Sequence, residues 1–447
     1  MKILDVLKNC TDDLLLVSKD KEISKKDFSI LVNNYVICLS NMPTGEGFIL
    51  VGEQDPISFY SLVFALWKSG KKVLFPNRDI LSNALKFPYY EYTVRVLNGK
   101  PYWEKNNDYQ ALQNIKGDAI VFSSGSTGDP KGIVHSKESF LLNAKRTADI
   151  IGLGVGGTVT PLKPYLMSAF SHFLVHYLTN SYLCFIENDR LEELVDYYKS
   201  DPTLAFVGSP MHILSGRKYI PNSASPRMFI SSGDFMHSNV IQNIIQDFPK
   251  SVYYYVYGIA ELGGRFFINK INSDTSIEDY SCLGRSLFNM NISVRDGEIY
   301  VDTESKFLGY IKKGRFIGVT GYYPSGDLVD IHNNCLTLIG RKGEEVKVAG
   351  NKVSLKNLEK KSLRAFPDEV LVFISVQHEI LGTLIAVVIQ SLERYSRKEV
   401  LVRLRSVLEA YEIPHYIYIF DKFPYTQSAK IDRKQIKDRL SDSTLIK

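Results

Sequence analysis

Residues 123–132 place hydroxyl groups, glycines and a lysine in one short loop. The loop reads Ser-Ser-Gly-Ser-Thr-Gly-Asp-Pro-Lys-Gly and follows the apolar run Ala119–Phe122, which is typical of a short buried strand. Glycines let a backbone turn tightly and approach an anion closely, and free N–H groups and hydroxyls bind phosphate oxygens. Lys131 adds a positive charge to this loop. The residue types therefore predict a polyphosphate-binding site.

The order of the residues separates this loop from the nucleoside-triphosphatase loop, which ends in Gly-Lys-Ser/Thr. Here Pro130 precedes Lys131 and Gly132 follows it. The ten residues instead resemble the signature loop of the adenylate-forming superfamily, which includes acyl-CoA synthetases, adenylation domains of peptide synthetases and luciferases. The resemblance implies an ATP phosphate site, with Thr127 in a catalytic role, made of Ser123, Ser124, Gly125, Ser126, Thr127, Gly128 and Lys131.

A second motif follows the predicted strand Val252–Tyr257. Gly258 comes next, and Glu261 lies three residues further on. The superfamily has Tyr-Gly-x-Thr/Ser-Glu here, which implies that Tyr257 lies along the adenine and that Glu261 is catalytic and holds Mg²⁺ against the phosphates. A hard cation that bridges phosphates prefers carboxylate oxygens and keeps most of its waters. Ala260 replaces the hydroxyl residue of the pattern.

Two acidic tripeptides resemble further nucleotide contacts. Ser232-Gly233-Asp234 corresponds to a Gly-Gly-Glu segment that packs on the adenine, which implies nucleotide contacts from Gly233 and Asp234. Ser325-Gly326-Asp327 corresponds to Thr/Ser-Gly-Asp, whose carboxylate accepts hydrogen bonds from both ribose hydroxyls. By itself, a Ser-Gly-Asp sequence indicates only a turn. Its order along the chain supports the resemblance.

The last two motifs resemble the hinge and the catalytic lysine of the superfamily. Gly340-Arg-Lys-Gly matches the hinge segment, with Arg341 as a second ribose contact and Lys342–Gly343 as the hinge. Glycine absorbs large backbone rotations, so Gly343 is compatible with a hinge. Lys430 matches the lysine that neutralises charge between the acid and the α-phosphate, and Ala429 replaces the usual glycine beside it.

The segment after the phosphate loop bears on the substrate. Adenylation domains for α-amino acids use an aspartate here to bind the ammonium group, but Leu162–Leu178 contains neither Asp nor Glu. An ammonium group buried there would lack a counter-charge, which is unfavourable. We therefore expect an aryl or aliphatic acid, with Tyr165, Ser168 and Ser232 as pocket residues. Alternatively, the aromatic residues of this segment simply fill the core.

Alternating apolar runs and helical patterns predict an α/β fold with mainly parallel sheets in a large N-terminal domain, residues 1–340. An antiparallel, barrel-like part is expected near Gly297–Gly340. Residues 341–447 are expected to form a small, mobile α+β domain that carries Lys430. The boundary is placed at Gly340–Gly343 because the pattern changes there.

Composition excludes several classes of protein. The 447 residues exceed the size at which one core keeps growing, and the composition, 45% hydrophobic and 23% charged, is that of a globular chain. No run approaches the roughly 20 apolar residues of a membrane span, and no signal peptide is apparent. The five cysteines are scattered, so we expect neither a disulfide framework nor a zinc site, and a cytoplasmic location.

The net charge of +5 is concentrated in the segment from Arg341 onward, where 20 Lys and Arg face 14 Asp and Glu. This excess would attract a nucleotide, coenzyme A or an acidic carrier protein, or it is a solvated helical surface. No basic run is dense enough to indicate nucleic acid.

Two patterns are interpreted as unrelated to chemistry. Gly152–Gly157 satisfies Gly-x-Gly-x-x-Gly but precedes no helix, so a dinucleotide site is rejected. His172 and His176 are four residues apart without the glutamate of a zinc protease, and we expect core or surface histidines.

Together the motifs predict an AMP-forming acid–thiol ligase that uses ATP and Mg²⁺. It would form acyl-AMP and pyrophosphate, and then a thioester with coenzyme A or a separate carrier protein. Two alternatives stay open: an adenylating enzyme with a different final product, and a non-catalytic nucleotide sensor. The acid, the thiol acceptor and the oligomeric state are not predicted.

Overall fold

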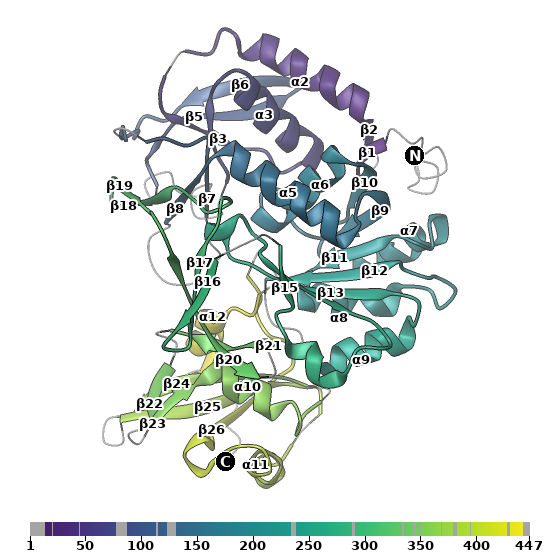
Figure 1. Ribbon diagram of the computed structural model, residues 1–447, viewed down its shortest axis with the longest axis vertical. Helices are drawn as coiled ribbons and strands as arrows, with labels where there is room; N and C mark the ends of the chain where they lie inside the picture. Colours follow the sequence, from purple (N-terminus) through teal and green to yellow (C-terminus); the bar gives the residue numbers. More distant parts are fainter. Residues whose placement is uncertain are drawn as a thin grey trace.

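The computed structural model describes residues 14–19, 21–43, 45–76, 87–112, 115–122, 131–233, 238–287, 291–332, 335–342, 345–348, 351–367, 369–378, 382–393, 395–426 and 430–440. Within these ranges the chain forms three sheets up to Arg341 and two smaller sheets after it. Figure 1 shows the later segments, in green to yellow, gathered at one end of the long axis.

The largest sheet has nine strands, in the spatial order β15 (Arg285–Ser286), β14 (Phe267–Ile271), β13 (Val252–Tyr257), β12 (Met228–Ser232), β11 (Ala205–Gly208), β9 (Val155–Thr160), β10 (Asn180–Phe185), β1 (Leu14–Ser18) and β2 (Lys21–Ser24). The strands from β13 to β1 are parallel, and antiparallel strands border them. A parallel strand is covered on both faces, which explains why β1 and β11 are mainly apolar and buried throughout.

The second sheet has eight strands, in the order β19 (Arg315–Gly318), β18 (Gly309–Lys312), β8 (Gly132–His135), β7 (Ala119–Phe122), β4 (Lys72–Leu74), β3 (Phe48–Val51), β5 (Tyr90–Leu97) and β6 (Lys100–Lys105). Strands β7, β4, β3 and β5 are parallel. With the first sheet, this confirms the predicted α/β class with mainly parallel sheets.

Helices pack between and around these sheets (Figure 1). The α-helices of the large part are α2 (Lys25–Leu39), α3 (Pro56–Lys68), α5 (Lys137–Ile151), α6 (Met167–Leu178), α7 (Leu194–Ser200), α8 (Pro210–Gly216) and α9 (Ser238–Asp247). Helices α2, α3 and α5 begin at Ser24, Asp55 and Ser136, whose side chains accept hydrogen bonds from the N–H three residues later. One core cluster joins α3, α5 and α6 to both sheets, and its rings include Tyr60 stacked on Phe173 at 3.9 Å.

A third sheet is antiparallel and lies where the barrel-like part was predicted. Its order is β16 (Asn291–Arg295), β17 (Glu298–Asp302), β20 (Tyr323–His332) and β21 (Cys335–Arg341). Short 3₁₀ helices complete the large part: η2 (Leu191–Glu193), η3 (Arg217–Tyr219), η4 (Ala260–Leu262) and η5 (Ile277–Ser281).

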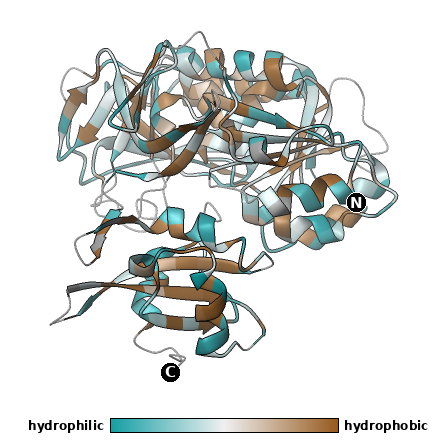
Figure 2. Ribbon diagram, turned by 60° about the horizontal axis from the view of Figure 1, so that its bottom comes forward, coloured by the Kyte–Doolittle hydropathy of each residue, from teal (hydrophilic) through white to brown (hydrophobic). Residues whose placement is uncertain are grey.

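The segments after Arg341 form a small α+β unit with its own core. Its elements are β22 (Glu345–Val348), β23 (Asn351–Ser354), α10 (Leu355–Ser362), β24 (Val370–His378), β25 (Gly382–Gln390), α11 (Arg397–Arg405), η6 (Ala410–Glu412), β26 (Tyr416–Phe420) and α12 (Arg433–Arg439). Buried Leu358, Phe373, Val387 and Val400 belong to one cluster of this unit. Figure 2 shows its apolar strands in brown, enclosed by more polar helices.

The expectation that the cysteines are unpaired is wrong for Cys282 and Cys335, which form a disulfide with their Cα atoms 5.5 Å apart. Cys282 follows η5, and its backbone forms an isolated bridge with Thr337 of β21. Spacing along the sequence does not reveal this pair because the tertiary fold brings two distant segments together. Among the described residues, none of the helices has the length and apolar character to cross a bilayer.

Candidate functional site

Three predicted nucleotide residues meet where β13, β20 and β21 approach one another. The Tyr257 hydroxyl at the end of β13 donates a hydrogen bond to Asp327 Oδ2, and both residues are buried. The register of β20 and β21 pairs Asp327 with Arg341, and Arg341 Nε lies 3.6 Å from Asp327 Oδ1. The fold therefore places a carboxylate between a phenol and a guanidinium.

The electrostatics of this group keep the phenol protonated. Burial, followed by the neighbouring Asp327 carboxylate, raises the pKa of Tyr257 well above its ordinary value. Tyr257 therefore remains a hydrogen-bond donor at neutral pH. Asp327 also has its main-chain N–H bonded to Ser325 Oγ at 3.0 Å, which fixes the backbone of β20 just before it.

Glu261 lies in η4, directly after β13, and is 8% exposed. Its Oε1 accepts a hydrogen bond of 2.8 Å from the Tyr310 hydroxyl, which lies 2.7 Å from the hydroxyl of Tyr323. Burial, then the charge of Glu261, raises the pKa of Tyr323 to about 12. Gly263 ends the turn with a φ of 83°, a left-handed conformation that favours glycine. The two tyrosines thus orient one carboxylate oxygen.

His135 links the strand after the phosphate loop to the turn of Glu261. Burial lowers the pKa of His135 to about 4, so the ring is neutral at pH 7. Its Nε2 lies 2.8 Å from the carbonyl oxygen of Ala260, and because a carbonyl only accepts, Nε2 carries the proton. Sequence reasoning missed His135 and Tyr323 because neither belongs to a recognised motif.

Lys430 extends from the small unit to β12 of the large part. A Cβ atom built on Gly233 would lie 3.5 Å from Lys430 Cε, and Gly233 has a φ of 93°. The loop that carries the lysine is closed by two hydrogen bonds, Thr426 N–H to Lys430 O at 2.7 Å and Lys430 N–H to Thr426 Oγ1 at 3.2 Å. A distance of 3.5 Å is an ordinary van der Waals contact, so the left-handed backbone, rather than lack of space, is what favours glycine at this position.

The predicted hinge begins with a residue that is bonded to the large part. Lys342 Nζ donates to Glu298 Oε2 at 2.8 Å, and Lys342 N–H donates to Gly326 O at 2.7 Å. Glu298 Oε1 also accepts from the N–H of Gly326 at 3.0 Å. Glu298, which sequence reasoning did not single out, therefore holds the part of β20 that precedes Asp327.

Several predicted residues lie outside the described ranges: 123–130, Asp234, Gly343 and Ala429. Lys131 is described and exposed, immediately before β8. Of the expected pocket residues, Tyr165 is buried, and Ser168 and Ser232 are partly buried near the start of α6 and at the end of β12. His172 and His176 are buried in α6, and no metal-binding group of three or more His, Cys, Asp or Glu occurs in the described parts.

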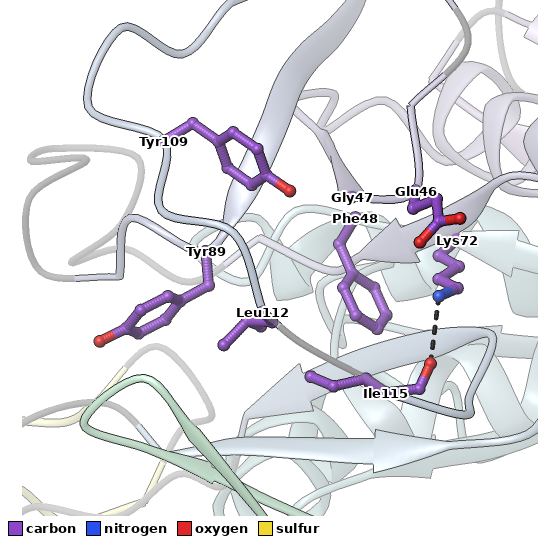
Figure 3. A pocket seen from close by; sticks show the side chains of 8 residues that line it. All are labelled: Glu46, Gly47, Phe48, Lys72, Tyr89, Tyr109, Leu112 and Ile115. Atoms are coloured by element: carbon purple, nitrogen blue, oxygen red, sulfur yellow. Dashed lines mark hydrogen bonds between the residues drawn. The ribbon is translucent and has the colours of Figure 1, made fainter.

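A small cavity lies in the second sheet, away from these residues. Glu46, Phe48, Lys72 and Ile115 are among its lining residues, and Lys72 Nζ donates to Ile115 O at 3.1 Å (Figure 3). Its volume of about 10 Å³ holds no more than one water molecule. It contains none of the predicted site residues and is too small for an acid or a nucleotide.

Sequence comparison identifies relatives among ligases and peptide synthetases. The chain is 25% identical to a mycosubtilin synthase of Bacillus subtilis over 78% of its length, although the match covers only 14% of that larger protein. It is 22% identical to the D-alanine–D-alanyl carrier protein ligase of Listeria innocua, over 76% of this chain and 74% of the ligase.

Comparison with solved structures shows the fold over almost the whole chain. The o-succinylbenzoate CoA synthetase of Bacillus subtilis, in complex with its acyl-adenylate intermediate, has a TM-score of 0.77 at 16% identity over 97% of each chain. The anthranilate CoA ligase AuaEII with anthranoyl-AMP has the same TM-score and identity, over 98% of this chain and 97% of the other. The sequence pattern of the AMP-binding enzymes matches residues 64–311. This chain therefore belongs to the AMP-binding enzyme family, as the resemblance to adenylate-forming enzymes predicted.

Proposed function

We propose that the chain is an AMP-forming acid–thiol ligase. In the first step a carboxylate oxygen of the acid attacks the α-phosphorus of ATP, and pyrophosphate leaves. In the second step a thiol attacks the acyl carbon of the acyl-AMP, and AMP leaves as the thioester forms. The two steps require one nucleotide site and two different environments at the acyl group.

One observation carries the proposal: Lys430 of the small unit lies beside Gly233 while Tyr257, Asp327 and Arg341 are in contact. The last three residues would bind the nucleoside, because an ionised carboxylate accepts hydrogen bonds from both ribose hydroxyls. Lys430 would offset the negative charge that accumulates as the carboxylate approaches the phosphate. Such catalysis depends mainly on positioning and electrostatics.

The residues present fit a magnesium ion that is bound together with ATP. Glu261 offers a buried carboxylate, and Tyr310 donates to only one of its oxygens in the contacts described above. Mg²⁺ is commonly bound through one or two carboxylates, phosphates and water. When bound, the ion would neutralise phosphate charge and orient the triphosphate, while Lys131 and the hydroxyls of 123–127 would bind its terminal phosphates.

The proposed acid is not an α-amino acid. The segment from Leu162 to Leu178 has no carboxylate to pair with an ammonium group, and the buried cation nearby is Arg265. The proposed acceptor is coenzyme A or a separate carrier protein. The family relatives include ligases for both kinds of acceptor, such as the CoA synthetase and the carrier protein ligase reported above.

The decisive experiment is acid-dependent exchange of labelled pyrophosphate into ATP, measured over a panel of aryl, aliphatic and amino acids. The proposal predicts exchange with at least one non-amino acid and, on addition of coenzyme A or a pantetheinylated carrier, a thioester. Absence of exchange with every acid would contradict it. Pyrophosphate exchange without formation of a thioester would support the adenylation step and contradict the thiol-transfer step.

A further inference from the structure

Arg265 is a buried cation without a described counter-charge. It directly follows the two glycines after Glu261, and it is 1% exposed. Its Nη1 has no hydrogen-bond partner among the described residues, and Nη2 makes one bond of 3.4 Å to the carbonyl oxygen of Ser168. Burial lowers the pKa of Arg265 to about 9, and no carboxylate of the described residues offsets this shift. An isolated buried charge is unfavourable, so an anion is the group that this position lacks.

Helix α6 adds polar atoms that also lack partners. Both ring nitrogens of His172 and the hydroxyl of Ser171 are buried and without a hydrogen bond in the described parts of the chain. Burial and then the charge of Arg265 lower the pKa of His172, so its imidazole is neutral and carries one N–H donor. His176, one turn further, uses Nδ1 to contact Ser181 Oγ at 2.6 Å, while its Nε2 has no described partner.

The main chain of Arg265 lies next to the proposed nucleotide site. A Cβ on Gly258, part of the nucleotide motif, would lie 2.7 Å from Arg265 Cα, and a Cβ on Gly264 would lie 3.3 Å from Met167 Cγ. From α5, Asn143 Nδ2 donates to the carbonyl oxygen of Arg265 at 2.8 Å. The main chain of Arg265 therefore backs the nucleotide turn, and its side chain reaches the start of α6, where the acid was expected to bind.

Resting on the proposed function, we propose that Arg265 binds a second carboxylate at the far end of the acid substrate. Its two terminal nitrogens match the two oxygens of a carboxylate, and such paired, charged hydrogen bonds are strong and directional. The imidazole of His172 and the hydroxyl of Ser171 can each donate one further bond. The substrate class is then a dicarboxylic acid, of which one carboxyl group is adenylated and the other is held by Arg265.

The first test uses the wild-type protein and the pyrophosphate exchange reaction. It compares three acids with the same carbon skeleton: a dicarboxylic acid, its methyl half-ester and the corresponding monocarboxylic acid. The comparison is made for straight-chain and for aryl acids. For at least one length, kcat/KM should be at least tenfold higher for the dicarboxylic acid than for its half-ester. Equal kcat/KM for diacid and half-ester at every length would overturn the inference and leave the ligase proposal intact. Water or another group would then occupy the site beside Arg265. No exchange with any acid would overturn both.

Variants locate the preference at Arg265. Arg265→Met should remove the preference for the diacid over the half-ester, and Arg265→Lys should retain part of it. The matched control is Arg227→Met. Arg227 is a partly buried arginine whose Nη2 already has a partner, the carbonyl oxygen of Gly157 at 2.8 Å. The ratio of kcat/KM for diacid and half-ester in this variant should match that of the wild type. The ratio is measured within one variant, so partial misfolding does not alter it. A preference for the diacid that persists in Arg265→Met would overturn the assignment. If Arg265→Met does not fold, an unreduced preference in Arg265→Lys would overturn it.

Discussion

The nucleotide side and the acid side of the candidate site are both buried and polar, but they differ in their hydrogen bonds. Tyr257, Asp327 and Glu261 contact polar groups contributed by other strands. On the acid side, by contrast, Arg265 and His172 of α6 retain polar atoms without a described partner. Buried polar groups are normally satisfied, so this difference supports the proposal that the nucleotide side is preorganised and that the acid side binds an anionic group of the substrate.

The largest effect should come from Lys430, which approaches the nucleotide side from outside. Lys430→Ala should lower the rate of pyrophosphate exchange by about 10²–10³-fold, the range for loss of one preorganised charge-stabilising donor. Thioester formation from supplied acyl-AMP should largely persist, because the proposed role is confined to adenylation. Both half-reactions are measured separately, and an equal loss of both would refute this division of roles.

Removal of the charge at Asp327 should weaken nucleotide binding. A hydrogen bond to a charged group contributes about 1.5–3 kcal/mol, so Asp327→Asn should raise the KM for ATP by roughly 10- to 100-fold. The matched control is Asp330→Asn, an exposed aspartate on the same strand, which should leave this KM unchanged. An unchanged KM in Asp327→Asn would show that the preorganised group does not bind the ribose.

The neutral histidine of the nucleotide side predicts a pH dependence of stability. The pKa of His135 is lowered from 6.5 to about 4 in the folded chain, so between these values the unfolded chain binds more protons. The free energy of unfolding should therefore fall as the pH falls from 6.5 to 4, by an amount on the order of 3 kcal/mol from this residue.

Urea unfolding followed by fluorescence at several pH values measures this dependence. His135→Gln, which keeps an N–H donor but does not titrate, should show a shallower decrease than the wild type over the same window. If the free energy of unfolding fell equally steeply with pH in both proteins, His135 would not contribute to the pH dependence of stability. His172, whose pKa burial also lowers, contributes to the slope that remains.

The smallest effect is expected at the tyrosines that orient Glu261. Tyr310→Phe removes the 2.8 Å bond that orients the carboxylate but leaves its charge in place, so the KM for Mg²⁺–ATP should rise only about two- to tenfold. Tyr323→Phe should have a smaller effect, because Tyr310 can still donate to Glu261. The reverse order of effects would show that the carboxylate is oriented in another way.

The nucleotide side could be predicted from sequence because its residues lie in short motifs of fixed order. Tyr257, Asp327 and Arg341 come from three strands, and the structure brings them into contact, while their role in nucleotide binding stays a prediction. The partners that hold these residues could not be named. His135, Glu298 and Tyr323 act through contacts between distant strands, and no local pattern marks such contacts.

The fold was predictable where the hydrophobic periodicity was strong. The apolar run Ala119–Phe122 is β7, and the strand expected at Val252–Tyr257 is β13. The hairpin of β5 and β6 and the pairing of Cys282 with Cys335 were missed, because the first carries few continuous apolar residues and the second depends on tertiary proximity. Arg265 was not singled out either, since one arginine outside a motif has no distinguishing sequence signal.

Lys342 is attached to the large part by its bonds to Glu298 and Gly326. If the small unit rotates during catalysis, these two bonds determine which residues would move with it and which would stay with the large part. Rotation of the small unit would have to start beyond Lys342, so Asp327 and Arg341 would stay with the large part and Lys430 would leave. One bound nucleotide would then be retained through both half-reactions while the acyl group is uncovered. The position of this anchoring residue along the chain would thus decide which nucleotide contacts persist after Lys430 has withdrawn.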